Sequence, residues 1–237
     1  MTATATTPLI VETAALETVE VDMYRDIHKG LRFGLFAVTQ SAGSVDPYDR
    51  EAVRAVAGQW ADMVQLLVEH AEHEDVFVQP VIERFAPAYA EEIAAAHPRL
   101  EAQMAELEVL ADRAADAGSD RARLLTHRLY LGLASFTAEY LQHQEFEEFE
   151  VMVMLSQHVS PDELRALDDS IIASVSPERL AATALLTLPA MNIEDQTELV
   201  EHARGGMPPE VFQGMVMLAE SVLEPARFQA LCARIGL

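Results

Sequence analysis

The sequence predicts an all-α protein, with an up-down-up-down four-helix bundle followed by a C-terminal cluster of short helices. Half of the 237 residues are hydrophobic but only 6% are aromatic, a balance more typical of helices than of a β-sandwich. Apolar residues recur every three or four positions over long stretches, which indicates amphipathic helices. Turn-forming and capping residues separate these stretches. The length suits one bundle and a smaller second unit.

Four long amphipathic stretches make up the predicted bundle. The first ends at the turn-forming segment SAGSVD, and the second opens at Asp46-Pro47, a favourable N-cap followed by proline at the first helical position. The second is expected to end before Pro80, and the third ends at AGSD. The expected helices cover about residues 17–40, 46–79, 87–116 and 121–155. Their short connections favour antiparallel neighbours.

Helix-start signals are closer together beyond residue 157 than before it. Helix-start signals recur there every 16 residues, and they predict short helices of about three turns. These signals are Ser160-Pro, Ser176-Pro, Asn192, Pro208-Pro and Glu224-Pro. The predicted organisation is therefore a flexible tail over residues 1–18, the bundle over 19–157 and a helical extension over 158–237.

The charge and the cysteine count exclude several classes of partner. A formal charge of −23 repels nucleic acid and anionic membrane surfaces, so we expect neither as a partner. Cys232 is the only cysteine, which excludes an intrachain disulfide and a thiolate metal cluster. The N-terminus lacks a basic leader region, and no run of 18 apolar residues occurs. We expect a cytoplasmic protein.

Three segments share the pattern His-x-x-x-Glu. They are His70 to Glu74, His97 to Glu101 and His143 to Glu147. On a helix, positions i and i+4 lie one turn apart on nearly the same face, so each pair projects an imidazole beside a carboxylate. Each of three predicted helices thus offers a pair of metal ligands.

The first predicted helix adds a fourth histidine. His28 lies on the same apolar face as Tyr24 and Leu31, which we expect to point inward. Several histidines and carboxylates cannot be buried together without cations. Imidazole and carboxylate without thiolate suit iron, manganese or zinc, and the number of ligands favours two ions, bridged by carboxylates.

The segments RDIHKGLR, HAEHEDVFVQP, HPRLE and HQEFEE resemble the hemerythrin and HHE cation-binding family over roughly residues 20–156. The resemblance implies a non-haem di-iron centre in a bundle of four helices, and iron shuttling between Fe2+ and Fe3+ with a bridging oxide or hydroxide. The ligands that it implies are His28, His70, Glu74, His97, His143 and a carboxylate of the pair Glu147 and Glu148. Manganese and zinc are the alternatives to iron.

Residues close to the predicted metal ligands have supporting or alternative roles. Glu147 is the expected ligand of its pair, with Glu148 as the substitute. His73 is expected to contact the metal ligands or to be exposed to solvent, rather than to bind metal itself. Asp75 is expected to accept a hydrogen bond from an imidazole N–H. We expect Tyr24 beside the ligands.

The third predicted helix departs from the family pattern. Members that carry oxygen have a fifth histidine one turn after the third-helix histidine, where this chain has Glu101. Pro98 follows His97 directly, and proline disfavours the helical conformation of the residue before it. The helix is therefore expected to kink or restart here, which leaves the placement of Glu101 open.

These features lead to two functional hypotheses. In the first, the protein reacts with dioxygen or a related small oxidant, either peroxide or nitric oxide, and decomposes peroxide or activates oxygen as a di-iron oxidoreductase. In the second, it binds, stores or senses oxygen or iron without turnover. The extension is expected to contact a protein partner or a second copy of the chain.

Overall fold

The computed structural model describes residues 19–206 and 208–237, and the predicted tail over residues 1–18 lies outside them. The described residues form helices joined by turns and loops and contain no strand, so the fold is all-α, as predicted. The long helices are α1 (Arg25–Ser44), α2 (Arg50–His73), α4 (Pro87–Ala115) and α5 (Ala122–Phe146). Short continuations are α3 (Gln79–Phe85) and α6 (Met152–His158). The C-terminal helices are α7 (Pro161–Ser174), α8 (Pro177–Ala190), α9 (Ile193–Gly206), α10 (Pro209–Val222) and α11 (Pro225–Ile235).

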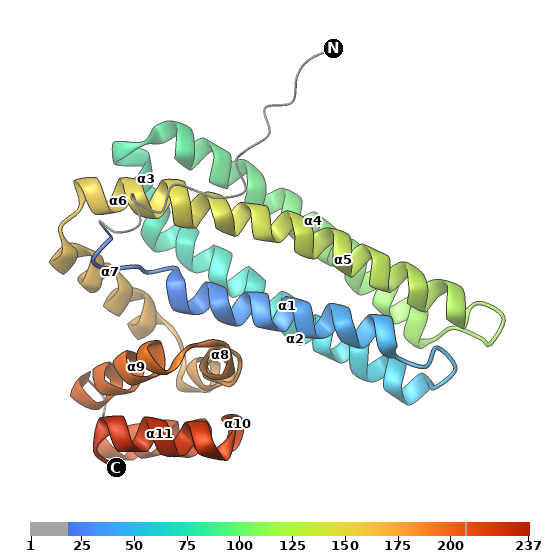
Figure 1. The fold of residues 1–237 in the computed structure, drawn as a ribbon. Coiled ribbons are helices and arrows are strands. Elements are labelled where there is room, and N and C mark those ends of the chain that lie inside the picture. The colour runs from blue at the N-terminus through green and yellow to red at the C-terminus, as the bar shows by residue number, and fades with distance from the viewer. Residues whose placement is uncertain (1–18, 207) are drawn as a thin grey trace.

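The four long helices lie side by side, with the C-terminal helices at one end and against α1 (Figure 1). Helix α1 contacts α2 and α5, and α4 contacts α2 and α5. Their shared interior is apolar over most of its length, with Trp60 packed edge-to-face against Phe136 at 5.3 Å. Burial of this apolar surface is the main stabilising contribution.

Two of the long helices continue through a π-helical turn. Segment η2 (Glu74–Val78) joins α2 to α3, and η3 (Glu147–Val151) joins α5 to α6. In each turn, a backbone N–H bonds to the carbonyl five residues earlier: Gln79 to Glu74, and Met152 to Glu147. Such single-turn π-bulges often mark functional sites.

Neither of the two prolines expected to interrupt a helix does so. The second helical stretch was predicted to end before Pro80, but it continues as α3 to Phe85, because Pro80 lies in the first turn of α3, where an N–H is dispensable. Pro98 lies inside α4, which is unbroken from Pro87 to Ala115.

The C-terminal helices begin at the predicted positions. Ser160 caps α7 in a capping box with Glu163, and the Ser176 side chain caps α8. Helix α8 packs against α1 at two glycines, where a Cβ on Gly30 would lie 2.5 Å from Thr187 Cγ2 and one on Gly34 would lie 3.1 Å from Leu186 Cδ1. The glycines therefore permit the close approach of α8 to α1.

Ion pairs fix the extension beside the long helices. Lys29 of α1 pairs with the largely buried Asp195 of α9, and Arg25 lies 2.8 Å from Glu198. Arg179 of α8 donates to Glu69 of α2 at 2.7 Å. Lys29 and Glu69 are the chain neighbours of His28 and His70, so these ion pairs attach the extension close to two of the predicted ligands.

Within the described ranges, no single helix is long and apolar enough to cross a membrane. Helices α7 and α8 pass the same test only when they are taken together, and the chain bends by 115° between them.

A substitution at Gly30 tests the packing of α8 on α1. Gly30→Ala should lower the free energy of unfolding by about 1–3 kcal/mol, because the added methyl group collides with Thr187. Gly58→Ala is the control, since nothing lies within 4 Å of a Cβ there, and it should stabilise the helix by about 1 kcal/mol. Chemical denaturation of both variants measures the difference. Equal stabilisation by the two substitutions would contradict the close packing.

Candidate metal centre

The buried stripe of each long helix determines which residues point inward. Buried positions alternate in steps of three and four residues along all four helices, which is the spacing of a helix face that packs against neighbours. The stripes that contain histidines are Tyr24, His28, Leu31 and Leu35, from the residue before α1 into that helix; Leu67, His70 and Glu74, across the junction of α2 and η2; Ile93, His97, Leu100 and Met104 in α4; and Tyr140, His143 and Glu147, across the junction of α5 and η3. All are buried except His70, whose side chain is 10% exposed. The four histidines therefore meet in the interior at one level.

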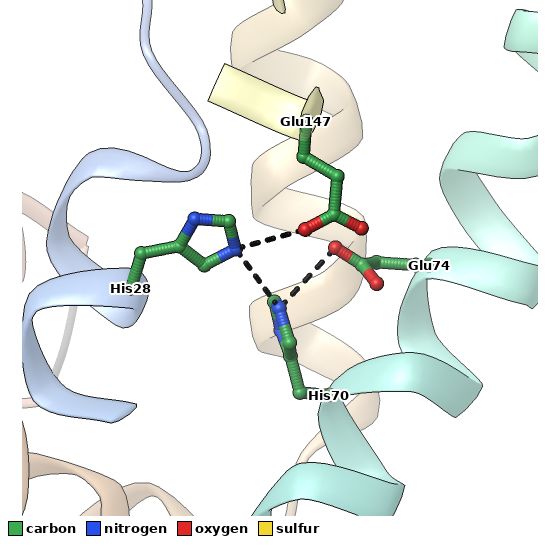
Figure 2. A group of neighbouring side chains, drawn as sticks. All are labelled: His28, His70, Glu74 and Glu147. Atoms are coloured by element: carbon green, nitrogen blue, oxygen red, sulfur yellow. Dashed lines mark hydrogen bonds and ion pairs between the residues drawn. The ribbon is translucent and has the colours of Figure 1, made fainter. Parts of the chain in front are cut away.

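His28, His70, Glu74 and Glu147 form the first group of side chains (Figure 2). The Nε2 atoms of His28 and His70 lie 3.2 Å apart. Glu74 Oε1 lies 3.2 Å from His70 Nε2, and Glu147 Oε2 lies 3.4 Å from His28 Nε2. One ligand atom from each of the four lies within 4.8 Å of the others, so this group could hold a metal ion.

The same two carboxylates complete a second group with His97 and His143. Glu74 Oε2 lies 3.4 Å from His97 Nε2, and Glu147 Oε1 lies 3.0 Å from His143 Nε2. Each carboxylate thus presents one oxygen to each group. Two neighbouring positions for cations, which share Glu74 and Glu147, follow from this arrangement.

The four long helices form two halves, α1 with α2 and α4 with α5, and the two halves repeat one pattern. Glu74 faces His70 of its own helix and His97 of the other half, and Glu147 faces His143 and His28 in the same way. In both halves the π turn begins at this glutamate.

The residue after each glutamate orients a histidine of the other half. Asp75 Oδ1 lies 2.9 Å from His97 Nδ1, and Glu148 Oε1 lies 2.9 Å from His28 Nδ1. Arg32 donates two hydrogen bonds to Glu148, at 2.7 and 2.9 Å. Because a carboxylate accepts the Nδ1–H, the Nε2 atom of each histidine is directed at the centre, where it could bind a metal.

Burial disfavours charge on the protein groups of the centre. It raises the pKa of Glu147 to about 8, and it also raises the pKa of Glu74, to which the nearby Glu147 adds. Burial lowers the pKa of His70 and His143 to about 4. For His97 burial acts in the same direction, but Glu74 and Asp75 outweigh it and raise the pKa to about 9. These shifts describe carboxylates that lack a compensating positive charge.

The polar atoms of the centre fit a cation. All four oxygens of Glu74 and Glu147, together with Nε2 of His97, are buried without a hydrogen-bond partner among the described residues. Buried polar atoms in proteins are nearly always paired, and leaving carboxylates bare costs several kcal/mol. Metal ions between these lone pairs would satisfy them together.

Glu101 does not join the predicted ligands. Its side chain is exposed and belongs to neither group, although α4 is unbroken at Pro98. The buried stripe explains this placement, because it steps from His97 to Leu100 by three residues, whereas it steps by four from His70 to Glu74 and from His143 to Glu147. Position 101 therefore lies beside the stripe, on the outside.

The remaining predicted neighbours lie at the periphery of the centre. Glu148 contacts His28 Nδ1 rather than joining either group. His73 is half-buried, with its ring 6.5 Å from that of Phe77. Tyr24 is buried, with its ring 5.0 Å from that of His28.

Sequence reasoning missed two residues of this region. Tyr140 is buried with its ring 5.9 Å from that of His143, and Arg32 fixes Glu148. Tyr140 lies three residues before His143 on the buried stripe, as Leu67 does before His70, so its place could have been found from the helix phase.

Comparisons with protein-family models, with curated proteins and with solved structures found no match for this chain. The class of site therefore rests on the geometry: a buried cluster of histidines and glutamates that could hold metal ions.

Glu147→Gln should change stability in opposite directions in the two metal states. Without metal it should raise the melting temperature, because it removes a buried acid that competes with Glu74. With metal it should lower the melting temperature and bring bound metal below one ion per chain, because both groups lose a shared ligand. Calorimetry and metal analysis would measure both effects.

Glu101→Gln is the matched control, since it makes the same chemical change at an exposed position of α4. Neither the metal content nor the melting temperature should change. Equal effects of the two substitutions would show that Glu147 does not hold metal.

The stability of the metal-free protein should fall as pH rises from 6.5 to 8. Glu147 and His97 have folded-state pKa values of about 8 and 9, above their ordinary 4.5 and 6.5, so the folded chain holds protons that the unfolded chain releases. This contribution is complete below the ordinary pKa and is lost as pH rises through the raised one. Each such proton is worth about 1.4 kcal/mol per pH unit within its window.

The lowered pKa values of His70 and His143 act only between about 4 and 6.5, outside this range. Bound metal displaces the protons, so the gap in melting temperature between metal-loaded and metal-free protein should widen from pH 6.5 to 8. Calorimetry at the two pH values, with and without a chelator, tests this. A constant gap would contradict it.

Proposed function

We propose that this chain is a hemerythrin-like non-haem di-iron protein that reacts with dioxygen or a related small oxidant and decomposes peroxide. The observation that carries the proposal is that Glu74 and Glu147 are shared between two groups of ligands, each with two histidines. Imidazole with carboxylate suits iron, and two histidines with a carboxylate and open positions are typical of non-haem iron sites that react with oxygen.

The arrangement of the helices supports membership of the hemerythrin-like class. The inward residues follow the order His28, then His70 and Glu74, then His97, then His143 and Glu147, as the resemblance in sequence implies. Contacts of α1 with α2 and α5, and of α4 with α2 and α5, are those of an up-down-up-down four-helix bundle. We assign the four long helices to such a bundle.

The residues of the chain bind and orient the ions in this proposal. Asp75 and Glu148 hold His97 and His28 with Nε2 directed inward, and buried apolar residues flank the centre along the helices. Iron, when bound there, supplies electron transfer to dioxygen or peroxide. Glu74 and Glu147 would hold both ions, because each carboxylate presents one oxygen to each group.

The position of Glu101 favours a second candidate, a protein that binds or senses oxygen without turnover. As a ligand, Glu101 would have added negative charge to the centre and stabilised ferric iron against release of oxygen. Because Glu101 is exposed, that argument for turnover does not apply. The two candidates therefore differ in a measurable property, the reversibility of oxygen binding.

Protein loaded with iron should hold two ions per chain and should accelerate the decay of hydrogen peroxide at least tenfold over the Glu147→Gln variant. Zinc-loaded protein is the control, because zinc has no redox chemistry and should be inactive. Stopped-flow spectra of the ferrous protein mixed with oxygen, together with peroxide assays, measure both properties. A stable, reversible oxygen adduct without peroxide decay would favour the second candidate, and a native content of one zinc ion would contradict both.

A further inference from the structure

A cavity between the long helices and the extension borders one half of the centre. It has a volume of about 260 Å3 and lies between α1 and α2 on one side and α7, α8 and α9 on the other. Its lining includes His70 and Glu74, which belong to the first group of ligands. Because a water molecule occupies roughly 30 Å3 in the liquid, a small ion can enter this space together with several water molecules. Apolar side chains of the extension form much of the wall, among them Ile171, Ile172, Val175 and Leu180.

The lining of the cavity runs from partly exposed to buried residues. The side chains of Asp26 and Glu69 are 30% and 28% exposed, whereas that of Glu74 is 8% exposed. His70 is the most exposed of the four histidines, at 10% of its side chain against 6% or less for the others. The cavity therefore connects the half-exposed carboxylates to a ligand of the centre.

His70 lies between the cavity and the centre. Its Nε2 atom is 3.2 Å from both His28 Nε2 and Glu74 Oε1, so its other ring nitrogen, Nδ1, points away from the centre. In His97 and His28 the Nδ1 atom bonds to a carboxylate, but Nδ1 of His70 has no such partner among the described residues. An ion at the inner end of the cavity would thus be one side chain away from the first group.

Carboxylates dominate the charge of the lining. Asp26 pairs with Arg25, and Glu69 pairs with Arg179. Asp22 accepts hydrogen bonds from backbone N–H groups, and within the described ranges neither Asp22 nor Asp168 forms an ion pair with Lys or Arg. Five acids line the cavity and none of its described lining residues is Lys or Arg; the acids are Asp22, Asp26, Glu69, Glu74 and Asp168. Negative charge between apolar walls attracts cations more strongly than it would in open water.

Asp168 is the acid that the extension contributes. It belongs to α7, is half-buried and lines the same cavity as Asp26 of α1. Burial raises the pKa of Asp168 above the ordinary 3.8, and the carboxylates of Asp169 and Asp26 add to the effect, although His202 acts against it. The carboxylates therefore repel one another, and a cation near Asp168 would relieve that repulsion.

The cleft on the other side of the centre is less suited to cations. The outer side of His143 lines this cleft together with Glu92, Arg99 and Glu139. Arg99 is 55% exposed and pairs with Glu139, so a positive charge lies on that approach. A divalent cation would meet less repulsion on the side of His70.

We propose that divalent metal ions reach the centre through the cavity between the long helices and the extension, where Asp168 attracts them and His70 receives them. The proposal rests on the metal-binding part of the proposed function and does not depend on the redox chemistry of iron. The extension would thus promote loading of the centre, although it supplies no ligand to either group.

The rate of Co2+ uptake by the metal-free protein tests the role of Asp168. Co2+ absorbs visible light when imidazole and carboxylate bind it, so stopped-flow mixing measures uptake without a redox readout. Asp168→Asn should lower the rate by about three- to tenfold at low salt, and the bound Co2+ at equilibrium should stay the same. The rate difference should shrink as salt is added, because salt screens the attraction.

Asp169→Asn is the matched control, because it makes the same change at the next residue of α7. The Asp169 side chain is 62% exposed, faces His202 and is not part of the lining. Uptake by this variant should match that of the unmodified protein. An unchanged rate in Asp168→Asn, or equal slowing in both variants, would overturn the proposal.

Bulky substitutions distinguish the two possible routes. Thr183→Phe places a ring in the cavity and should slow Co2+ uptake, whereas Leu185→Phe, at an exposed position of the same helix, should not. Ala138→Phe narrows the cleft beside His143 and should also leave the rate unchanged. Slowing by Ala138→Phe but not by Thr183→Phe would place the entrance at His143 and overturn the proposal.

The amount of Co2+ bound at equilibrium separates this proposal from the proposed function. Full binding at the same rate in the unmodified protein and in Asp168→Asn would overturn the route and leave the metal centre standing. A protein that binds no Co2+ at all would refute the metal centre, and the route with it.

Discussion

The structure depends on the charge balance at two buried carboxylates. Glu74 and Glu147 lie in the interior, each with its two oxygens facing histidines of two different helices. Without cations, burial raises the pKa of both carboxyl groups and lowers the pKa of His70 and His143. The interior then contains polar atoms without partners. Metal ions would convert the same atoms into the strongest attraction in the core.

The arrangement of the helices follows from the need to bring these groups to one level. Each histidine occupies a position on the buried stripe of its helix, and each glutamate begins a π turn. The residues after the glutamates, Asp75 and Glu148, reach back to the histidines of the other half. Each pair of helices, α1 with α2 and α4 with α5, thus orients ligands for the other pair, and neither pair contains a complete group of ligands. The extension adds asymmetry by covering the side of His70 with apolar residues.

Local sequence signals were sufficient for the helices and for most of the centre. Periodicity identified the long helices and caps the starts of the short ones, because these features depend on neighbours within one turn. The cap expected at Asp46 was wrong, since Asp49 caps α2. The i and i+4 pairs identified His70 with Glu74 and His143 with Glu147. The same rule failed for Glu101, because spacing within one helix does not determine which of two adjacent faces packs inward. The phase of the apolar residues around His97, read over several turns, contains that information.

Other features could not be read from local signals. The π turns have no residue signature here, and Pro80 indicated the end of a helix where the chain continues as α3. The role of Arg32 depends on the distance between α1 and the π turn after α5, which is set by tertiary packing. The cavity between the long helices and the extension also arises only when segments more than a hundred residues apart come together, as the pair of Glu69 and Arg179 shows.

The central claim is that two metal ions share Glu74 and Glu147. Anomalous diffraction at the iron absorption edge, from crystals of iron-loaded protein, tests it most directly. The account predicts two peaks about 3–4 Å apart, one within bonding distance of His28 and His70 and the other of His97 and His143, with both glutamates between them. A single peak, or peaks away from these glutamates, would contradict it.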